Sequence, residues 1–328
     1  MKELEIYGTL GPSCKDETII KTMFELGMTG IRLNLSHCNL WDRKEWIDHY
    51  NRVKDEMNSH ADLLIDMHGP ELRVHHLKND ILLEEETVIT IDDNIFPKRV
   101  LEEIDVNDMI LLDDGKIKIK VIQVLNNSFN ARVLRGGILK NNKSIAVVGK
   151  QIEGEVLTEL DMLNLREANS YGVTAIMQPF VHDKEALIKV RSVLNELGLK
   201  HLKIYAKIED SIGYEHLEEL LDYCDCIVIA RGDLGNAYGL TVLPVIQHRI
   251  EEVCKRHHKP YMVVTEMLSS MLNCAVPTRA EVNDIFQAVY NGASSIMLTG
   301  ETASGKYPVE AMKYFTQTAY LALKEKEG

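Results

Sequence analysis

The sequence lacks any apolar run close to the roughly 20 residues that a helix needs to cross a bilayer. Its first residues lead straight into a predicted strand, without the apolar core of a signal peptide. Its 6 cysteines contain no Cys-x-x-Cys pair, which is typical of reduced thiols rather than of zinc sites or a disulfide framework. We therefore expect a cytoplasmic protein that does not bind a membrane.

The chain also lacks an excess of positive charge, because 37 Lys and Arg residues stand against 50 Asp and Glu residues, giving a net charge of −13. Charges of both signs are spread along the whole sequence. This distribution argues against a broad nucleic-acid-binding surface. An anionic substrate would therefore have to meet a local group of positive side chains.

Short apolar runs alternate with segments of helical periodicity eight times along the chain, once one middle segment is set aside. We expect strands at 4–10, 30–35, 63–67, 174–178, 202–207, 226–230, 261–265 and 295–298. We expect helices at 15–27, 40–58, 159–171, 183–197, 211–223, 241–257, 279–291 and 308–325. This pattern predicts an α/β fold, a (β/α)8 TIM barrel formed by residues 1–73 and 148–328.

The segment that was set aside, 74–147, has a different character. Its stretches 87–91 and 116–121 alternate between apolar and polar residues, and turn residues such as Gly136-Gly137 separate them. Without this segment the chain has roughly the 250 residues of a typical barrel. The pattern predicts a small all-β domain, similar to a β-barrel, inserted after strand 3 as a lid over the C-terminal face.

Charged residues follow two of the predicted barrel strands directly. Lys207 and Glu209 follow one strand, and Arg231 and Asp233 follow the next. Barrel enzymes carry their catalytic residues at these strand ends. A lysine beside two carboxylates suits a divalent metal and an anion, because hard cations prefer oxygen ligands and lysine serves as a point charge for phosphate. A set of salt bridges between loops is the alternative.

Seven short motifs follow one another along the chain, most of them at predicted strand ends. They are Gly11-Pro12, Arg32-Leu-Asn-Leu-Ser-His37, Asp66-Met-His-Gly-Pro-Glu-Leu-Arg73, Lys207-Ile-Glu209, Ala230-Arg-Gly-Asp-Leu-Gly235, Pro277-Thr-Arg-Ala-Glu281 and Gly300-Glu-Thr-Ala303. In this order they resemble the pyruvate kinase family. The resemblance runs from about residue 4 to 325 and includes the predicted lid. It ends after the eighth helix, so the C-terminal domain of typical pyruvate kinases is expected to be absent.

The resemblance implies transfer of a phosphoryl group from phosphoenolpyruvate to ADP, followed by protonation of the enolate, with Mg²⁺ (or Mn²⁺) and K⁺ as cofactors. It assigns Lys207 to neutralise the phosphoryl group in transfer, and Arg32 to reach its oxygens. Glu209 and Asp233 would hold the Mg²⁺. Thr265 would act in enolate protonation through a water molecule, because an unperturbed alcohol is a poor acid.

The resemblance also implies three further sets of residues. The substrate carboxylate would meet the backbone N–H groups of a short loop, with two threonines nearby: Arg231, Gly232, Asp233, Thr265 and Thr299. K⁺ would bind oxygen atoms of Asn34, Ser36, Asp66 and the carbonyl of Met67, and Glu71 resembles the form associated with K⁺ dependence. The nucleotide would lie near Arg32, His37, Arg73, Asp113 and Lys143.

The sequence departs from the family pattern at His68, where lysine is usual, at His182, where arginine is usual, and at Glu266, where glutamine is usual. These changes concern the acceptor side more than the donor side. They leave open a paralogue with another phosphoryl acceptor, a metal-dependent aldolase or lyase that stabilises the pyruvate enolate, and a catalytically silent sensor of phosphoenolpyruvate. The expected partners are small-molecule substrates, while the formation of a homo-oligomer remains open.

Overall fold

The barrel of this protein is closed by eight parallel strands. The computed structural model describes residues 4–75, 77–113, 115–150, 152 and 154–327. The strands are β1 (Glu5–Thr9), β2 (Gly30–Asn34), β3 (Asp62–Asp66), β11 (Ala175–Gln178), β12 (Lys203–Ile208), β13 (Cys226–Ala230), β14 (Tyr261–Val264) and β15 (Ser295–Met297). They pair in the order β1-β15-β14-β13-β12-β11-β3-β2. The predicted TIM barrel is confirmed, and each strand begins and ends within one residue of its expected position.

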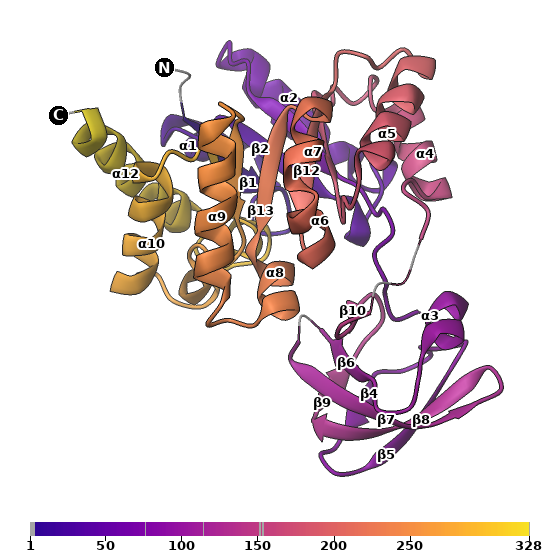
Figure 1. Ribbon diagram of the computed structural model, residues 1–328. Helices are drawn as coiled ribbons and strands as arrows, with labels where there is room; N and C mark the ends of the chain where they lie inside the picture. The colour runs from indigo at the N-terminus through magenta and orange to yellow at the C-terminus, as the bar shows by residue number, and fades with distance from the viewer. Residues whose placement is uncertain (1–3, 76, 114, 151, 153, 328) are drawn as a thin grey trace.

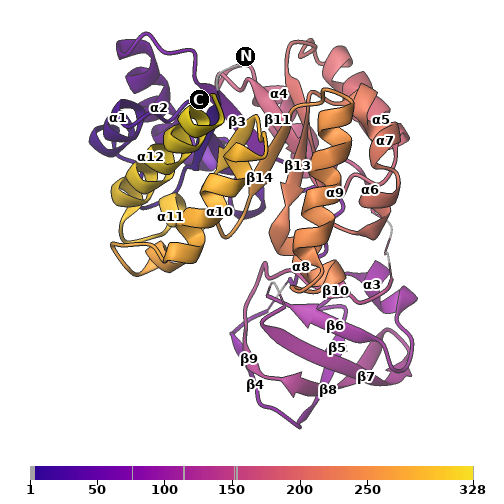
Figure 2. The same ribbon diagram turned by 60° about the vertical axis from the view of Figure 1, so that its left-hand side comes forward.

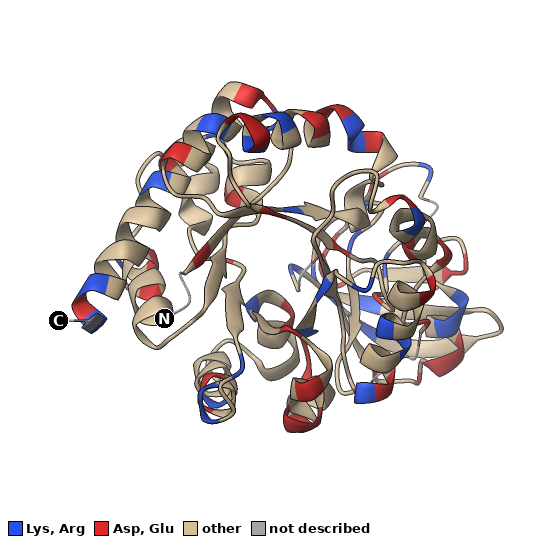
Figure 3. Cartoon of the chain, turned by 90° about the horizontal axis from the view of Figure 1, so that it is seen from above, with Lys and Arg blue, Asp and Glu red and all other residues tan. Residues whose placement is uncertain are grey.

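Helices surround this barrel, as the end-on view of Figure 3 shows. They include α1 (Glu17–Glu25), α2 (Lys44–Glu56), α4 (Glu159–Glu167), α5 (Lys184–Glu196), α9 (Leu243–Arg256), α10 (Arg279–Tyr290) and α12 (Pro308–Glu327). Two short helices that we did not expect are α8 (Arg231–Tyr238) and α11 (Gly300–Ala303). None of the helices in the described part of the chain is long and apolar enough to span a membrane.

The helix expected at 211–223 is divided. It forms α6 (Ser211–Glu215), α7 (Leu217–Leu220) and a 3-10 turn at Leu221–Tyr223. The break lies at His216, whose backbone leaves the helical conformation (φ −95°, ψ 7°). Its ring Nδ1 lies 2.8 Å from the carbonyl oxygen of His182, so a contact with a neighbouring loop accompanies the break.

The barrel strands have two buried faces, because side chains alternate along a strand. On β13, Ile227 and Ile229 belong to the core between the strands and the helices. Cys226, Val228 and Ala230 belong to the separate core inside the barrel. The strands are therefore mostly apolar in their middle residues, although Arg32 lies in the middle of β2, and Asp62 and Lys203 begin β3 and β12.

The inserted segment forms two antiparallel sheets with their own core. Its elements are β4 (Ile81–Leu83), β5 (Val88–Asp92), α3 (Lys98–Glu103), β6 (Met109–Leu112), β7 (Ile117–Leu125), β8 (Ser128–Arg135), β9 (Gly137–Leu139) and β10 (Ile145–Val147). The sheet orders are β10-β6-β7-β8-β5 and β4-β9 among the described residues of the segment, which we expected to be similar to a β-barrel. Helix α3 was not expected. Figures 1 and 2 show the segment beyond the end of the barrel where α8 begins.

Candidate active site

A cavity of about 230 Å³ lies at the carboxyl ends of the barrel strands. The side chains of the inserted segment complete one of its walls. The predicted site residues that line it are Arg32, Asn34, Ser36, His37, Asp66, Met67, Glu71, Arg73, Asp113, Lys143, Lys207, Glu209, Asp233, Thr265 and Thr299. The fold thus brings together residues that lie up to 267 positions apart, between Arg32 and Thr299.

Four charged side chains form a buried network on the barrel side of the cavity. Arg32 donates to Asp66 Oδ2 through Nε at 2.9 Å and through Nη2 at 2.6 Å. Lys207 Nζ lies 2.7 Å from Glu209 Oε1 and 3.4 Å from Asp66 Oδ1. Positive and negative groups therefore alternate through the network, and no charge is buried without an opposite neighbour.

The charged groups of this network shift one another's pKa values. Burial alone would lower the pKa of Lys207, but the carboxylates of Asp66 and Glu209 reverse this and hold it above its usual value. Burial would raise the pKa of Asp66, yet Lys207 and Arg32 outweigh it and lower this pKa. Burial raises the pKa of Glu209 in spite of the adjacent ammonium. Lys207 therefore remains protonated and available to an anion at neutral pH.

Glu209 and Asp233 suit a divalent cation. Both carboxylates line the cavity, and Glu209 is oriented by a hydrogen bond of 2.7 Å from the backbone N–H of Phe180 to its Oε2. Within the described ranges, no three His, Cys, Asp or Glu residues are grouped closely enough to hold a metal on their own. Mg²⁺ commonly binds one or two protein carboxylates and takes its other ligands from water and substrate, so this pair fits it.

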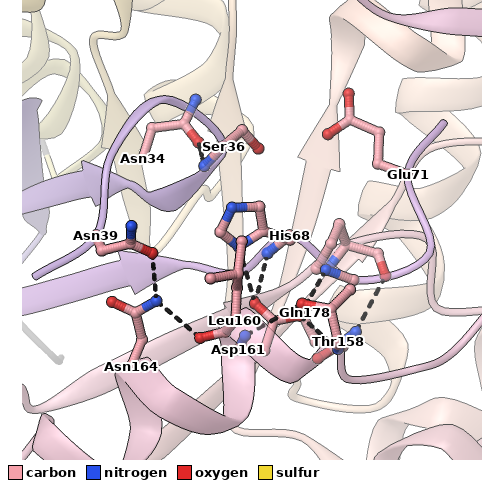
Figure 4. Close-up of polar contacts among 12 residues, drawn as sticks. Asn34, Ser36, Asn39, His68, Glu71, Thr158, Leu160, Asp161, Asn164 and Gln178 are labelled. Atoms are coloured by element: carbon pink, nitrogen blue, oxygen red, sulfur yellow. Dashed lines mark hydrogen bonds and ion pairs between the residues drawn. The ribbon is translucent and has the colours of Figure 1, made fainter. Parts of the chain in front are cut away.

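The oxygen atoms expected around K⁺ also lie together. Asp66 Oδ1 is buried and accepts no hydrogen bond from the described residues. Asn34 Oδ1 accepts from the N–H of Ser36 at 3.1 Å, and this contact caps the 3-10 turn Leu35–His37. Figure 4 shows Asn34 and Ser36 on one loop and Glu71 opposite them. Lys207 Nζ lies 3.4 Å from this oxygen but does not satisfy it with a hydrogen bond. Such an oxygen suits a cation, because a buried polar atom without a hydrogen bond is costly.

Thr265 belongs to a strained turn after β14. Thr265 and the exposed Glu266 have positive φ angles of 72° and 53°. The hydroxyl of Thr265 accepts from the N–H of Gly232 at 2.8 Å and donates to the Val264 carbonyl at 2.6 Å. Backbone strain of this kind persists only where surrounding contacts enforce it. The hydrogen bond between Thr265 and Gly232 joins the ends of β14 and β13.

The guanidinium of Arg231 does not line the cavity. It donates to the Thr265 carbonyl at 2.7 Å through Nη2 and to Asp284 Oδ2 at 2.6 Å through Nη1. Residues 231–233 open helix α8 rather than a loop, so their N–H groups belong to its first turn. First-turn N–H groups have no partner within their own helix and are available to an anion, except that the N–H of Gly232 already reaches Thr265.

The nucleotide-side residues form more exposed pairs. Lys143 Nζ lies 2.7 Å from Asp113 Oδ1, and both residues come from the inserted segment. Arg73 Nη2 lies 2.7 Å from the carboxylate of Glu71. Burial would raise the pKa of Asp113, but Lys143 and Lys116 lower it below its usual value. These pairs face the cavity without belonging to the buried network.

The three unusual residues lie in different places. His68 lies just after β3, where its ring Nδ1 lies 3.2 Å from Asp161 Oδ1. The ring of His182 pairs with Asp210 at 2.6 Å and lines a second cavity. Glu266 is exposed and does not line the first cavity. The change from the usual glutamine to Glu266 therefore places no side chain on the wall of the first cavity.

Two buried polar residues of α4, Asp161 and Asn164, were missed by the sequence reasoning. They hold the loops that follow β2 and β3, as Figure 4 shows. The available signal was the pair Thr158 and Asp161, which forms a capping box at the start of α4. Such a pattern predicts a helix start but not the tertiary contacts of the capping carboxylate.

The fold and the cavity at its strand ends define this protein as a (β/α)8-barrel enzyme with an inserted β-rich segment. Residues 1–312 match the family model described as pyruvate kinase, barrel domain. The chain therefore belongs to the pyruvate kinase family, and it is a transferase.

Individual pyruvate kinases support this assignment. That of Aeropyrum pernix is 35% identical over 327 residues, which cover 98% of this chain and 71% of the relative. That of Clostridium perfringens is 31% identical, with 97% of this chain and 70% of the relative covered. That of Sporosarcina psychrophila is 31% identical, with 97% of this chain and 57% of the relative covered. The likeness therefore extends over almost the whole of this chain.

Proposed function

We propose that this protein transfers the phosphoryl group of phosphoenolpyruvate to ADP and then protonates the resulting enolate. The observation that carries the proposal is the position of Lys207. Its ammonium lies within 3.4 Å of two buried carboxylates, Asp66 and Glu209, at the base of one cavity. Phosphoryl transfer depends on positioning and charge neutralisation. A permanently charged lysine next to Glu209, one of the two carboxylates proposed for the divalent metal, meets this need.

On the donor side, Lys207 and Arg32 meet the phosphoryl oxygens. Arg32 is held in one orientation by its two hydrogen bonds to Asp66. Its fork is suited to phosphate, and a fixed fork loses little conformational entropy on binding. Lys207 exchanges its contact with Glu209 for the phosphoryl group, and this exchange frees Glu209 Oε1 for the metal.

Glu209 and Asp233 would hold the divalent ion. When bound, it would supply positive charge that offsets the negative charge of the substrate. The N–H groups of Arg231 and Asp233 in the first turn of α8 receive the substrate carboxylate, since helix N-termini favour anions, while the N–H of Gly232 stays bonded to Thr265. Thr299 lines the same wall of the cavity, and its own N–H is taken by Glu301 at 2.8 Å.

Thr265 hands the proton to the enolate through water. Its hydroxyl donates to the Val264 carbonyl at 2.6 Å and turns away from it toward the cavity to reach a water molecule. The N–H of Gly232 remains bonded to the hydroxyl oxygen. The hydroxyl takes a proton back from solvent as the water molecule protonates the enolate, so no alkoxide is left. Thr265 thus contributes to protonation of the enolate carbon, after the phosphoryl group has been transferred.

We further propose that segment 74–147 acts as a lid that completes the nucleotide site. Asp113 and Lys143 supply one wall, while Arg73 and His37 supply the other. The oxygens of Asn34, Ser36, Asp66 and Met67 form a K⁺ site beside the phosphoryl position.

A coupled assay tests the proposed reaction. The protein is given phosphoenolpyruvate, Mg²⁺ and K⁺ with a panel of nucleoside diphosphates, and pyruvate and triphosphate are both measured. Equal formation of the two products is expected. Release of pyruvate without any triphosphate, with every diphosphate tried, would contradict ADP as the acceptor.

A second cavity supports an alternative function, in which the phosphoryl acceptor is not ADP. It measures about 250 Å³ and shares Glu71, Glu209 and Asp233 with the first cavity. Apolar residues of β10 and Ile212 line it, together with the His182 and Asp210 pair. A paralogue could seat an organic acceptor there, next to the metal-binding carboxylates. The same assay separates the two functions, because an unusual acceptor gives pyruvate only when that acceptor is supplied.

A further inference from the structure

Helix α4 presents two buried polar side chains to the loops at the top of the barrel. Asp161 and Asn164 are three positions apart, so they lie on the same face of the helix. Both are completely buried. Neither lines the cavity, yet each contacts a loop that carries candidate K⁺ ligands (Figure 4).

Asp161 holds the loop after β3. Its Oδ1 accepts the N–H of His68 at 2.8 Å, and its Oδ2 accepts the N–H of Gly69 at 3.0 Å. Oδ2 also accepts the N–H and the hydroxyl of Thr158, each at 2.8 Å. The carboxylate thus joins the chain that leaves the barrel for the insertion to the chain that returns from it.

The contact with His68 determines where the Met67 carbonyl points. In a trans peptide the carbonyl of one residue and the N–H of the next point in opposite directions. Because the N–H of His68 points at Asp161, the carbonyl of Met67 points away from α4. Met67 lines the cavity together with Asn34 and Asp66. The other side of Met67 is fixed by its own N–H, which donates to the Met177 carbonyl at 3.0 Å.

Asn164 holds the loop after β2 in a similar way. Its Oδ1 accepts the N–H of Leu40 at 2.9 Å, and its Nδ2 donates to Asn39 Oδ1 at 2.9 Å. Nδ2 also donates to the carbonyl of Leu160 within α4 at 2.8 Å. The start of the same loop is capped by Asn34 over Ser36. The segment 34–40 is therefore fixed at both ends.

We propose that Asp161 and Asn164 are positioning residues that set the distance and direction of the ligands for a monovalent cation. Asp161 aims the Met67 carbonyl, and Asn164 holds the loop that supplies Asn34 and Ser36. The proposal rests on the K⁺ site described above. It assigns to one face of α4 the role that outer-shell partners have in other metal sites, where their loss costs about 10–100-fold in affinity.

The test is the K⁺ requirement of Asp161→Asn and Asn164→Ala. In Asp161→Asn, the new amide NH2 faces N–H groups that previously met a carboxylate oxygen. We expect the K⁺ concentration for half-maximal activity to rise about 10–100-fold in this variant, while kcat at saturating K⁺ changes far less. Asn164→Ala is the milder second variant, with an expected rise of about 3–10-fold.

A second readout does not depend on turnover. The midpoint of thermal unfolding is measured with Mg²⁺ and phosphoenolpyruvate, without nucleotide, in increasing KCl against the same concentrations of tetramethylammonium chloride. Wild type is expected to gain stability specifically from K⁺. Asp161→Asn should need correspondingly more K⁺ for the same gain.

Two controls separate positioning from simple loss of a helix cap. Glu281 and Thr278 form the corresponding capping box on α10, and Glu281 accepts the N–H of Ser270 at 2.7 Å. Thr158→Val removes the hydroxyl that caps α4 but keeps both loop N–H contacts of Asp161. We expect Glu281→Gln and Thr158→Val to lower the unfolding midpoint while leaving the K⁺ requirement unchanged.

The possible failures are distinguishable. If wild type shows no K⁺ requirement by either readout, the proposed cation site is wrong and the positioning role falls with it. If wild type requires K⁺ but Asp161→Asn and Asn164→Ala keep the wild-type requirement, only the positioning role is wrong. An equal shift in Glu281→Gln would also overturn it, because the effect would then be general destabilisation.

Discussion

The two walls of the active-site cavity hold their charges differently. On the barrel side, the side chains of Lys207 and Glu209 are 14% and 1% exposed and belong to a continuous network. On the insertion side, Lys143 and Asp113 are 35% and 15% exposed and form a pair. Charges interact more strongly where solvent is excluded. The barrel wall is therefore the more preorganised of the two. Under the proposed function it acts on the donor, and the more exposed insertion wall admits the acceptor.

The largest effect should come from breaking the barrel wall at its metal ligand. Glu209→Gln removes one of two carboxylates available to the divalent ion. Since even outer-shell changes cost about 10–100-fold, we expect activity at fixed Mg²⁺ to fall by at least about 10²-fold. A titration with Mg²⁺ checks whether a higher concentration restores part of it. An unchanged Mg²⁺ dependence would remove Glu209 from the metal site.

The next prediction sharpens the comparison through stability. The free energy of unfolding that a buried carboxylate contributes should depend on pH. Burial raises the pKa of Asp161, but hydrogen bonds from His68 and Thr158 outweigh it, so the folded-state pKa lies below its usual value. A group of this kind stabilises the fold above its unfolded pKa of about 3.9, and the contribution disappears as pH falls through the folded pKa.

Asp161→Asn should therefore be less stable than wild type at pH 7, by about 2–3 kcal/mol. The difference should shrink as the pH is lowered below about 4. Urea unfolding from pH 7 to pH 3 measures it. A difference that stays constant over this range would show that the charge of Asp161 is not what stabilises the fold.

The smallest effect should come from the insertion wall. Lys143→Gln removes a partly exposed ion pair, which is worth about 0–1 kcal/mol of stability. We expect an increase of up to about 10-fold in the KM for ADP, little change in the KM for phosphoenolpyruvate, and an effect that weakens at high salt. Steady-state kinetics at two ionic strengths provide the measurement. A larger effect on phosphoenolpyruvate than on ADP would reverse the roles assigned to the two walls.

The barrel strands could be predicted from sequence because each is an apolar run that ends in polar residues. Helix α8 could not, because Gly232 and Gly235 are weak helix formers and its position depends on the strand before it. The break at His216 could not be predicted either, since it coincides with a tertiary contact to His182.

The candidate catalytic and metal-binding residues could be predicted from the sequence more fully than their hydrogen-bond and ion-pair partners. Lys207 lies near the end of β12, Glu209 and Asp233 follow β12 and β13, and the barrel rule brings strand ends together. The partner of Arg231 is Asp284, which lies 53 positions away on α10, and no local pattern indicates it. The contacts of Asp161 and Asn164 span 93 and 124 positions for the same reason.

The central claim is that the barrel wall alone stabilises the enolate of pyruvate. It is tested most directly by hydrogen exchange at the methyl group of pyruvate in D2O, with Mg²⁺, K⁺ and inorganic phosphate but no nucleotide. Proton NMR should show loss of the methyl signal with wild type and with Lys143→Gln at similar rates. Lys207→Met should slow it by at least about 10²-fold. Equal slowing in both variants, or no exchange by a wild-type protein that binds phosphoenolpyruvate, would contradict the claim.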